Sequence, residues 1–229
     1  MSKVKVLIAC EESQAITKEF RKIGIEAFSC DLLPCSGGHP EWHIQGDAIA
    51  EAYSEKYDLM IAHPPCTFLA VSGAGWLYNK DGTRNEQRWN DQADALDFVK
   101  KLMMAPIKHI AIENPVSVIS TQIRKPDQIV HPWQFGDEAS KATCFWLKNL
   151  PQLKPTKIVG KGEFFEWTDE NGVKKSQAKW YMDALVEAKT PEERRTLRSK
   201  TFKGMAKAIV NQWKDLESFA IQKTIFDEL

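Results

Sequence analysis

The chain has 229 residues, 43% of them hydrophobic and 27% charged, with a formal net charge of zero. This size predicts one large α/β domain with a small appended region, and no stretch reaches the roughly 18 apolar residues that a membrane span needs. The charged start predicts that there is no signal peptide. Five scattered cysteines favour a reducing cytoplasm over a disulfide scaffold.

The charge is unevenly spread along the chain. Residues 148–214 hold 15 Lys and Arg against 8 Asp and Glu, whereas residues 1–147 hold 15 against 19. A basic region of this kind can meet the phosphates of a nucleic acid. It is equally compatible with an ordinary solvated surface, because a charge run alone says little about a partner.

The first two thirds of the chain alternate short apolar runs with helical patterns, which predicts βαβ units and a mostly parallel sheet. Strands are expected at residues 4–10, 25–31, 57–63, 107–113 and 143–147. A first helix should begin at Ser13, as its N-cap, and end before Gly24. A second, amphipathic helix over residues 85–104 is predicted by the spacing of Trp89, Ala93, Leu96, Val99 and Met103.

The last third of the chain is predicted to differ in character. Residues 151–190 are irregular and basic, with a hairpin turn expected at residues 170–172. From residue 192 the pattern is helical, with one apolar face between Phe202 and Leu216. We therefore predict a core at residues 1–150, a small basic insertion at 151–190, and a helical segment at 191–229 that packs back on the core.

Chemically notable residues follow several of the predicted strands. Ligands of open parallel sheets bind at the carboxyl ends of the strands. Those ends read Ala9-Cys10-Glu11-Glu12-Ser13, Cys30-Asp31, His63-Pro64-Pro65-Cys66 and Glu113-Asn114-Pro115. Residues distant in the sequence should therefore converge on one edge of the sheet.

Cys66 is the candidate nucleophile of this edge. Two prolines fix the backbone before it, and a rigidly presented thiolate can attack an electron-poor carbon. The alternative is a buried cysteine that packs as a small hydrophobic residue.

Glu113, at a neighbouring strand end, favours the catalytic interpretation of Cys66, because a carboxylate can hydrogen-bond the ring nitrogen and amine of a bound base. Its alternative role is a helix cap or a surface charge.

These strings, in this order, resemble the cytosine-5 DNA methyltransferases. The segment at residues 58–66 is similar to their Pro-Cys nucleophile loop, and residues 113–115 are similar to their Glu-Asn-Val element. Residues 199–206 resemble the late segment that packs on the cofactor pocket. More closely, the strings ACE-x-S, SCDLLP, HIQGD, AHPPCT, AIENP, RKPDQI, PWQFG and KATC-x-WLK resemble a compact group of phage and prophage proteins labelled DNA methyltransferase.

The resemblance implies a Rossmann-like, S-adenosylmethionine-dependent fold with helices on both faces of the sheet. Asp31 would bind the ribose of the cofactor and Asp47 its adenine. The remaining cofactor contacts implied are Ala9, Cys10, Glu11, Glu12, Ser13, Leu32, Ala48, His63, Pro64 and Met205.

The resemblance also implies a covalent mechanism on DNA. Cys66 would add to C6 of a flipped cytosine, Glu113 would pair with the ring edge, and C5 would take the methyl group. Asn114, Pro65 and Lys141 would complete the catalytic group. The substrate would be contacted by Thr67, Phe68, Trp76 and Thr143, with residues 73–75 as a closing loop.

The chain departs from the family pattern at three places. Glu11 and Glu12 stand in a turn that is usually Gly-rich, and we expect them to suit a cationic sulfonium ligand better than a pyrophosphate. Thr67 replaces the usual Gln. The target-recognition domain is reduced to residues 151–190 or missing, so a partner protein is one source of recognition.

Several other interpretations remain open. Amino-methylating DNA enzymes also carry a Pro-Pro loop, although His63 and Cys66 fit neither end of theirs. Cys30, Cys35, His39 and His43 have an irregular zinc-like spacing, with Cys30 expected to face the core. His109 is expected to be a core histidine.

The eight tryptophans are expected to pack mostly in the core or rim; Trp76 and Trp133, which sit in predicted loops, are the better candidates for stacking on nucleic acid. The protein is alternatively a methyltransferase for free pyrimidine nucleotides, or a catalytically silent binder of DNA or a partner.

Overall fold

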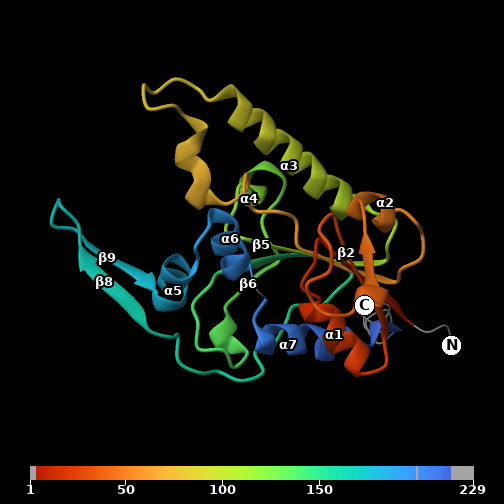
Figure 1. The fold of residues 1–229 in the computed structure, drawn as a ribbon. Coiled ribbons are helices and arrows are strands. Elements are labelled where there is room, and N and C mark those ends of the chain that lie inside the picture. Colours follow the sequence, from red (N-terminus) through yellow and green to blue (C-terminus); the bar gives the residue numbers. More distant parts are fainter. Residues whose placement is uncertain (1–3, 200, 218–229) are drawn as a thin grey trace, which may run out of the picture.

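A computed structural model describes residues 4–199 and 201–217. Seven strands form one sheet in the order β3-β2-β1-β4-β5-β7-β6 (Figure 1). Five strands run parallel: β1 (Lys5–Ala9), β2 (Glu26–Asp31), β3 (His43–Gln45), β4 (Leu59–Ala62) and β5 (His109–Pro115). The last two, β7 (Thr143–Lys148) and β6 (Gln128–Val130), complete the sheet with antiparallel pairing of β7 to both β5 and β6.

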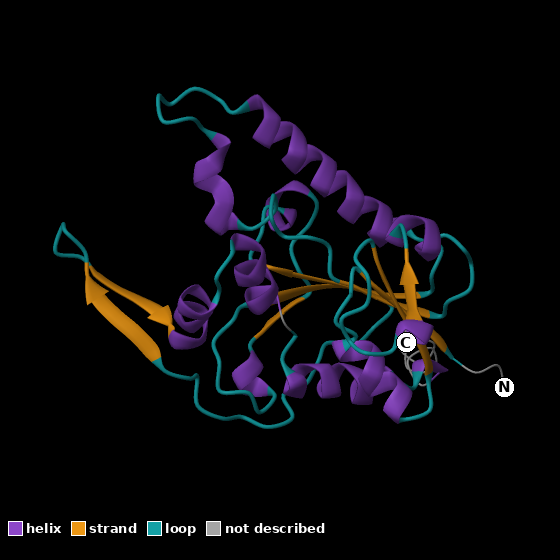
Figure 2. Ribbon diagram, viewed as in Figure 1, coloured by secondary structure: helices purple, strands orange, loops and turns teal. Residues whose placement is uncertain are grey.

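Helices cover both faces of this sheet (Figure 2). One face packs against α1 (Ala15–Lys22) and α7 (Lys203–Trp213), and the other packs against α2 (Ala48–Ala52) and α3 (Glu86–Met104). Side chains alternate between the faces along a strand, so Val6 and Ile8 join the first core while Leu7 and Ala9 join the second. The predicted Rossmann-like fold class is confirmed by this layered, mostly parallel arrangement.

The remaining helical elements connect or extend this framework. They are α4 (Ile119–Gln122), α5 (Lys179–Glu187), α6 (Pro191–Ser199), and three short 3₁₀ segments, at Pro40–Trp42, Val71–Leu77 and Pro132–Gln134. No helix within the described ranges is both long and apolar enough to cross a membrane.

The five predicted strands are confirmed to within two residues at each end. Four of them are apolar runs that the sheet buries on both faces, whereas β2 contains Glu26, Ser29 and Asp31 and is only partly buried at its ends. Sequence reasoning missed β3, β6 and α2, which are three to five residues long and too short for a periodic pattern.

The predicted N-cap of the first helix is wrong. Gln14 occupies that position, with φ 57° and no side-chain cap of its own. The helix is capped from further back, because the Glu11 carboxylate accepts hydrogen bonds from the amides of Ile16 (2.7 Å) and Thr17 (3.4 Å). Ser13 is therefore not needed as a cap.

The predicted helix at residues 85–104 is confirmed as α3, with Asn85 as its N-cap. Its buried face is rotated from the expected one: Gln92, Val99 and Leu102 are buried, whereas Ala93 is exposed. Sequence spacing alone treats Gln92 as polar and outward-facing, but its amide donates to the Phe68 carbonyl oxygen, which compensates its burial.

The predicted hairpin is confirmed as β8 (Phe164–Thr168) and β9 (Lys174–Ala178) around the turn at residues 169–173. These strands form a separate two-stranded sheet that projects from the main body (Figure 1). The helical pattern after residue 192 is also confirmed in α6 and α7. Lys200 and residues 218–229, which belong to the predicted C-terminal segment, lie outside the described residues.

Candidate functional site

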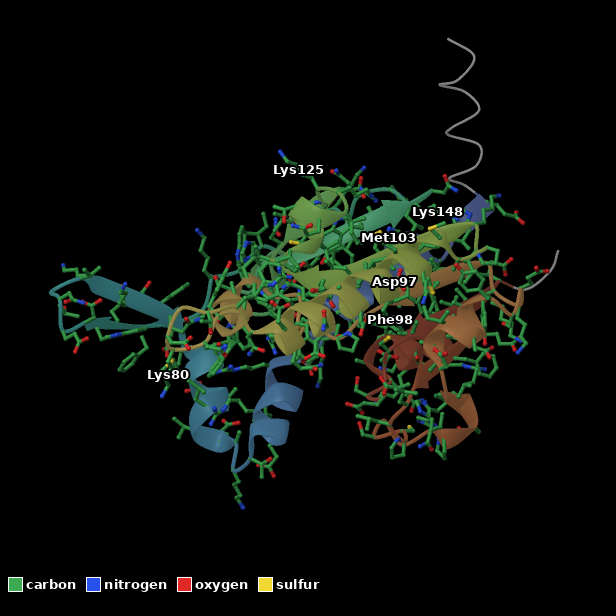
Figure 3. The ribbon with its side chains drawn as sticks, turned by 90° about the horizontal axis from the view of Figure 1, so that it is seen from above. Lys80, Asp97, Phe98, Met103, Lys125 and Lys148 are labelled. Atoms are coloured by element: carbon green, nitrogen blue, oxygen red, sulfur yellow. The ribbon has the colours of Figure 1, made fainter. Side chains whose placement is uncertain are left out.

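A cavity of about 360 Å³ lies at the carboxyl ends of β1, β2 and β4, where the parallel sheet was expected to bind a ligand. The helix α3 closes one side of it, and Phe98, labelled in Figure 3, belongs to that side. The lining residues come from five stretches of the chain: Cys10, Asp31, Leu32, Gly46, Asp47, Ala48, Pro65, Phe68, Asp91, Asp94, Ala95 and Phe98.

This cavity is acidic. Four of the lining residues are aspartates, and none of the described residues that line it is Lys, Arg or His. Asp31 and Asp47 are held in place by the backbone, since one oxygen of Asp31 accepts from the Leu33 amide (2.9 Å) and one of Asp47 accepts from the Ile49 amide (2.8 Å). A ligand that carries positive charge is therefore favoured here.

Cys10 has a left-handed backbone, with φ 59°, at the floor of this cavity. Burial, and then the charge of Asp31, raise the pKa of its thiol far above the usual value. The Cys10 thiol is therefore neutral at physiological pH and is a wall of the cavity rather than a nucleophile.

The backbone of the loop that carries Cys66 is held both before and after Cys66 by hydrogen bonds from side chains. The buried Asn114 side chain donates to the Pro64 carbonyl oxygen at 2.8 Å, which joins this loop to the end of β5. On the other side, Arg88 of α3 donates to the Thr67 carbonyl oxygen at 2.6 Å, and its guanidinium lies 4.4 Å from the centroid of the Phe68 ring. The half-buried Cys66 thus sits in a loop whose backbone is fixed before and after it.

Glu113 and His63 form an ion pair at the ends of the neighbouring strands β5 and β4. His63 Nδ1 lies 2.9 Å from Glu113 Oε2, and only 15% and 18% of their side-chain areas are exposed. Burial would raise the pKa of Glu113, but the hydrogen bond and charge of His63, and the charge of Lys141, hold it below the usual value. Glu113 is therefore an ionised carboxylate.

A second, much smaller cavity of about 10 Å³ adjoins this pair, on the α7 side of the sheet. Its lining includes His63, Glu113, Lys141 and Met205. The volume is near the least that holds one water molecule, so this space does not accommodate a cofactor.

Two acidic residues expected at the cofactor are engaged elsewhere. Glu11 is buried and caps α1, and it also accepts from the Thr17 hydroxyl at 2.6 Å. Glu12 accepts a hydrogen bond from the Ser36 hydroxyl. The expectation that both face a sulfonium is therefore wrong for Glu11; the acidic surroundings are provided by Asp91 and Asp94 of α3 instead.

Other expected contacts lie away from the larger cavity. Ala9 and Thr143 are fully buried, and the Thr143 hydroxyl donates to the Lys141 carbonyl oxygen at 3.3 Å. His63 and Met205 border the small cavity instead, because the His63 side chain lies on the α7 side of the sheet and Met205 belongs to α7 itself. Trp76, by contrast, is 72% exposed in the 3₁₀ segment after the Cys66 loop.

The residues with zinc-like spacing have separate partners. Cys30 is buried in the core, as expected, and Cys35 donates to the Gln14 side-chain oxygen at 3.0 Å. His39 stacks on the ring of Trp42, while His43 lies between the Ser29 hydroxyl and the Leu33 carbonyl oxygen. The described residues contain no group of three side chains placed to hold a metal ion. The expectation for His109 is confirmed, since it is buried and bonds the Asn149 carbonyl oxygen at 2.7 Å.

No protein-family model matches the chain. No curated protein matches it either. Among solved structures, the chain is similar to a proposed DNA modification methyltransferase encoded within a prophage of E. coli, with 12% identity and a TM-score of 0.43. It is also similar to the Entamoeba histolytica methyltransferase EhMeth, with 17% identity and a TM-score of 0.47. Both matches cover 69% of this chain, but only 52% and 58% of the two neighbours.

Sequence reasoning missed the contribution of α3 to the site. Asp91 and Asp94 line the cavity, and Arg88 and Gln92 hold the backbone of the Cys66 loop. The signal was present in the spacing, because Asp91 and Gln92 follow Arg88 by three and four residues and Asp94 follows Asp91 by three, so that neighbours in this set share a side of the helix. Polar residues on a helix are usually interpreted as solvent-facing, so the sequence pattern did not indicate that this side of α3 faces the site.

Proposed function

We propose that the protein is an S-adenosylmethionine-dependent methyltransferase that acts on C5 of cytosine in DNA, with Cys66 as the nucleophile. The observation that carries the proposal is the joining of two chain segments by the Asn114–Pro64 and His63–Glu113 contacts. These contacts join the loop that carries Cys66 to the strand end that carries an ionised carboxylate, and Pro65 and Phe68 of the same loop line a cavity of ligand size. Nucleophile, ring-binding acid and cofactor space are the parts that this reaction requires.

The residues of the larger cavity fit the cofactor. S-adenosylmethionine carries a sulfonium and an ammonium against one carboxylate, so an acidic lining favours it. Asp31 and Asp47 both line this cavity; in the proposal Asp31, at the end of β2, accepts from the ribose hydroxyls and Asp47 accepts from the adenine amine. The apolar walls at Leu32 and Phe98 suit the adenine ring. When bound, the cofactor supplies an electrophilic methyl group.

The protein's own residues account for the rest of the reaction. The Cys66 thiol first loses its proton to solvent. As its sulfur then bonds to C6, the C5–C6 double bond opens and the ring nitrogen N3 takes a proton from solvent. Glu113 stabilises the ring by accepting from the exocyclic amine and from the new N3 proton. After C5 has taken the methyl group, its proton leaves to solvent, the C5–C6 double bond forms again, N3 loses its proton and the sulfur departs.

The projecting hairpin is the proposed contact with DNA. On one of its faces Phe165 and Trp167 lie 6.0 Å apart between ring centroids, and Trp167 is opposite Lys175 in the pairing of the strands. Both aromatic side chains are exposed, by 54% and 41%. Exposed rings beside a lysine provide stacking and phosphate contacts, which suit an unstacked or distorted strand.

The experiment that tests the proposal uses S-adenosylmethionine labelled in its methyl group. Duplex DNA, single-stranded DNA, RNA and free nucleotides are incubated separately with the protein and then digested to nucleosides for mass spectrometry. We expect label in 5-methylcytosine from DNA and its loss in Cys66→Ser. Cys35→Ser is the matched control, because that thiol lies outside the proposed reaction.

Each other outcome has a distinct meaning. Label found only in free nucleotides would mean that the substrate is a small nucleotide and not DNA. Label at an exocyclic amine would contradict attack by Cys66. No transfer to any pool, together with no cofactor binding by calorimetry, would refute the methyltransferase proposal.

A further inference from the structure

The buried partner of Glu113 is the most unusual feature of the site. His63 immediately precedes the two prolines of the nucleophile loop, and its Nδ1 faces Glu113 Oε2 at 2.9 Å. Its other ring nitrogen, Nε2, is buried without a hydrogen-bond partner among the described residues. The imidazole therefore bonds only the Glu113 carboxylate among the described residues.

Four ionisable groups from different elements surround this point. His63 is hydrogen-bonded to Glu113 of β5. It also interacts electrostatically with Glu11, from the segment before α1, and with Lys141, from the segment before β7. From α7, the apolar Met205 and Ile209 line the same small cavity. An imidazolium at His63 faces the Glu113 carboxylate directly, so the two opposite charges compensate each other in this low-dielectric place.

The balance of these groups favours the charged histidine. Burial opposes the imidazolium, but the hydrogen bond and charge of Glu113, and then the charge of Glu11, raise the pKa of His63 above the usual value despite Lys141. The same pairing keeps the pKa of Glu113 low. Glu113 can therefore accept hydrogen bonds but has no proton to donate.

We propose that His63 is a positioning residue which, as an imidazolium, fixes the Glu113 carboxylate in the orientation that accepts from an amino-bearing pyrimidine. The inference rests on the proposed function of this site. A carboxylate accepts from the exocyclic amine of cytosine, whereas it repels the carbonyl oxygen that uracil and thymine carry at the same place. His63 thereby contributes to base selection without touching the base.

The first test follows the imidazole itself and needs no activity. Nuclear magnetic resonance of the five histidines, with His63 assigned by its loss in His63→Gln, measures the pKa of each ring. We expect His63 to titrate above 6.5, and to titrate at lower pH in Glu113→Gln because its main partner has lost its charge. A His63 ring that titrates below 6.5 in the wild-type protein would overturn the inference.

The second test measures methyl transfer against pH. The wild-type rate should fall as pH rises through the His63 pKa, because Glu113 then loses its charged partner. His63→Gln should lose this fall and transfer roughly 10- to 100-fold more slowly, the scale of one charge-assisted hydrogen bond. Its cofactor affinity should be unchanged, because His63 lies outside the larger cavity.

The control variant is His109→Gln, another histidine of the sheet whose ring bonds a carbonyl oxygen and which lies far from the loop in the sequence. It should keep the wild-type pH profile. Base selection is read from the ratio of rates on oligonucleotides with cytosine or uracil at the target, which should fall in His63→Gln.

The outcomes separate the two proposals. Absence of transfer by the wild-type protein refutes the proposed function, whereas the titration of His63 still shows whether its imidazole is charged beside Glu113. Transfer with a pH profile and base selection that His63→Gln leaves unchanged refutes the role of His63 and retains the function.

Discussion

Single residues in this protein serve both the stability of the fold and the chemistry proposed for it. Glu11 illustrates the overlap, since it stands among residues expected to bind a cofactor and instead caps α1 with its buried carboxylate. An acidic residue next to the amino end of a helix compensates the unpaired amides there. The same side chain contributes to the electrostatic surroundings of His63, although burial raises the pKa of Glu11 above its usual value.

The pair formed by His63 and Glu113 makes stability depend on pH at the residue scale. The folded pKa of His63 is raised above 6.5, so its contribution is complete below that value and is lost as pH rises through the folded pKa. The folded pKa of Glu113 is lowered below 4.5, so its contribution is present above that value and is lost as pH falls through the folded pKa. The pair therefore stabilises most between pH 4.5 and 6.5.

We predict that His63→Gln lowers the free energy of unfolding by about 1.5–3 kcal/mol in that window, the range for a hydrogen bond to a charged group. The difference between wild type and variant should shrink as pH rises above the folded pKa of His63. Urea unfolding at a series of pH values measures it. A difference that grows toward alkaline pH would contradict the assignment of charge.

At the scale of elements, the start of α7 is held in a tight contact. The Gly204 amide donates to Asp137 at 2.8 Å, and a Cβ at residue 204 would collide with the Phe135 carbonyl oxygen and lie 2.6 Å from the Asp137 carboxylate. Glycine is required here because of space and not because of a left-handed backbone.

We therefore predict that Gly204→Ala lowers the free energy of unfolding by about 1–3 kcal/mol, the usual cost of overpacking. Gly160→Ala is the control, since a Cβ there meets no atom within 4 Å. Chemical unfolding of both variants checks the result. Equal free energies of unfolding for the two variants would show that the segment around Phe135 can move to make room for a Cβ without loss of stability.

The hairpin β8–β9 carries three exposed aromatic side chains on one strand, Phe164, Phe165 and Trp167. We predict that Trp167→Ala weakens binding of single-stranded DNA by about 1–3 kcal/mol, the contribution of one stacked base. Val186→Ala, which removes another exposed apolar side chain from α5, should leave binding unchanged. Fluorescence anisotropy at several salt concentrations measures both, and a loss shared by the two variants would argue against stacking.

For the whole molecule, the proposed cofactor binding should be linked to folding, because the larger cavity is assembled from segments that follow β1, β2, β3 and β4 and from α3. We predict that S-adenosylmethionine at a hundred times its dissociation constant raises the free energy of unfolding by about 2.7 kcal/mol. At the same concentration, Asp31→Asn should show a smaller gain, whereas Asp97→Asn should match wild type. Asp97 pairs with Lys101 on the outer side of α3 and does not line the cavity.

Thermal unfolding with and without the cofactor measures these gains. A rise in Tm that is equal in wild type and Asp31→Asn would place the cofactor elsewhere. No rise in any of the three proteins would contradict binding altogether.

The sequence by itself determined the layered α/β architecture and the edge at which the candidate residues gather. Apolar runs bounded by turn residues define the parallel strands, and the carboxyl ends of such strands necessarily meet. For that reason Asp31, Cys66 and Glu113 could be singled out before their surroundings were known.

Only the tertiary structure decided what each side chain at that edge contacts. It turned Glu11 toward α1, paired Glu113 with His63, and brought Asp91 of α3 to the cavity. A strand pattern gives the face on which a side chain lies, but its partner comes from another element whose distance and angle depend on the packing of the whole core. The local sequence around His63 therefore contains no sign of a carboxylate that lies fifty residues further along the chain.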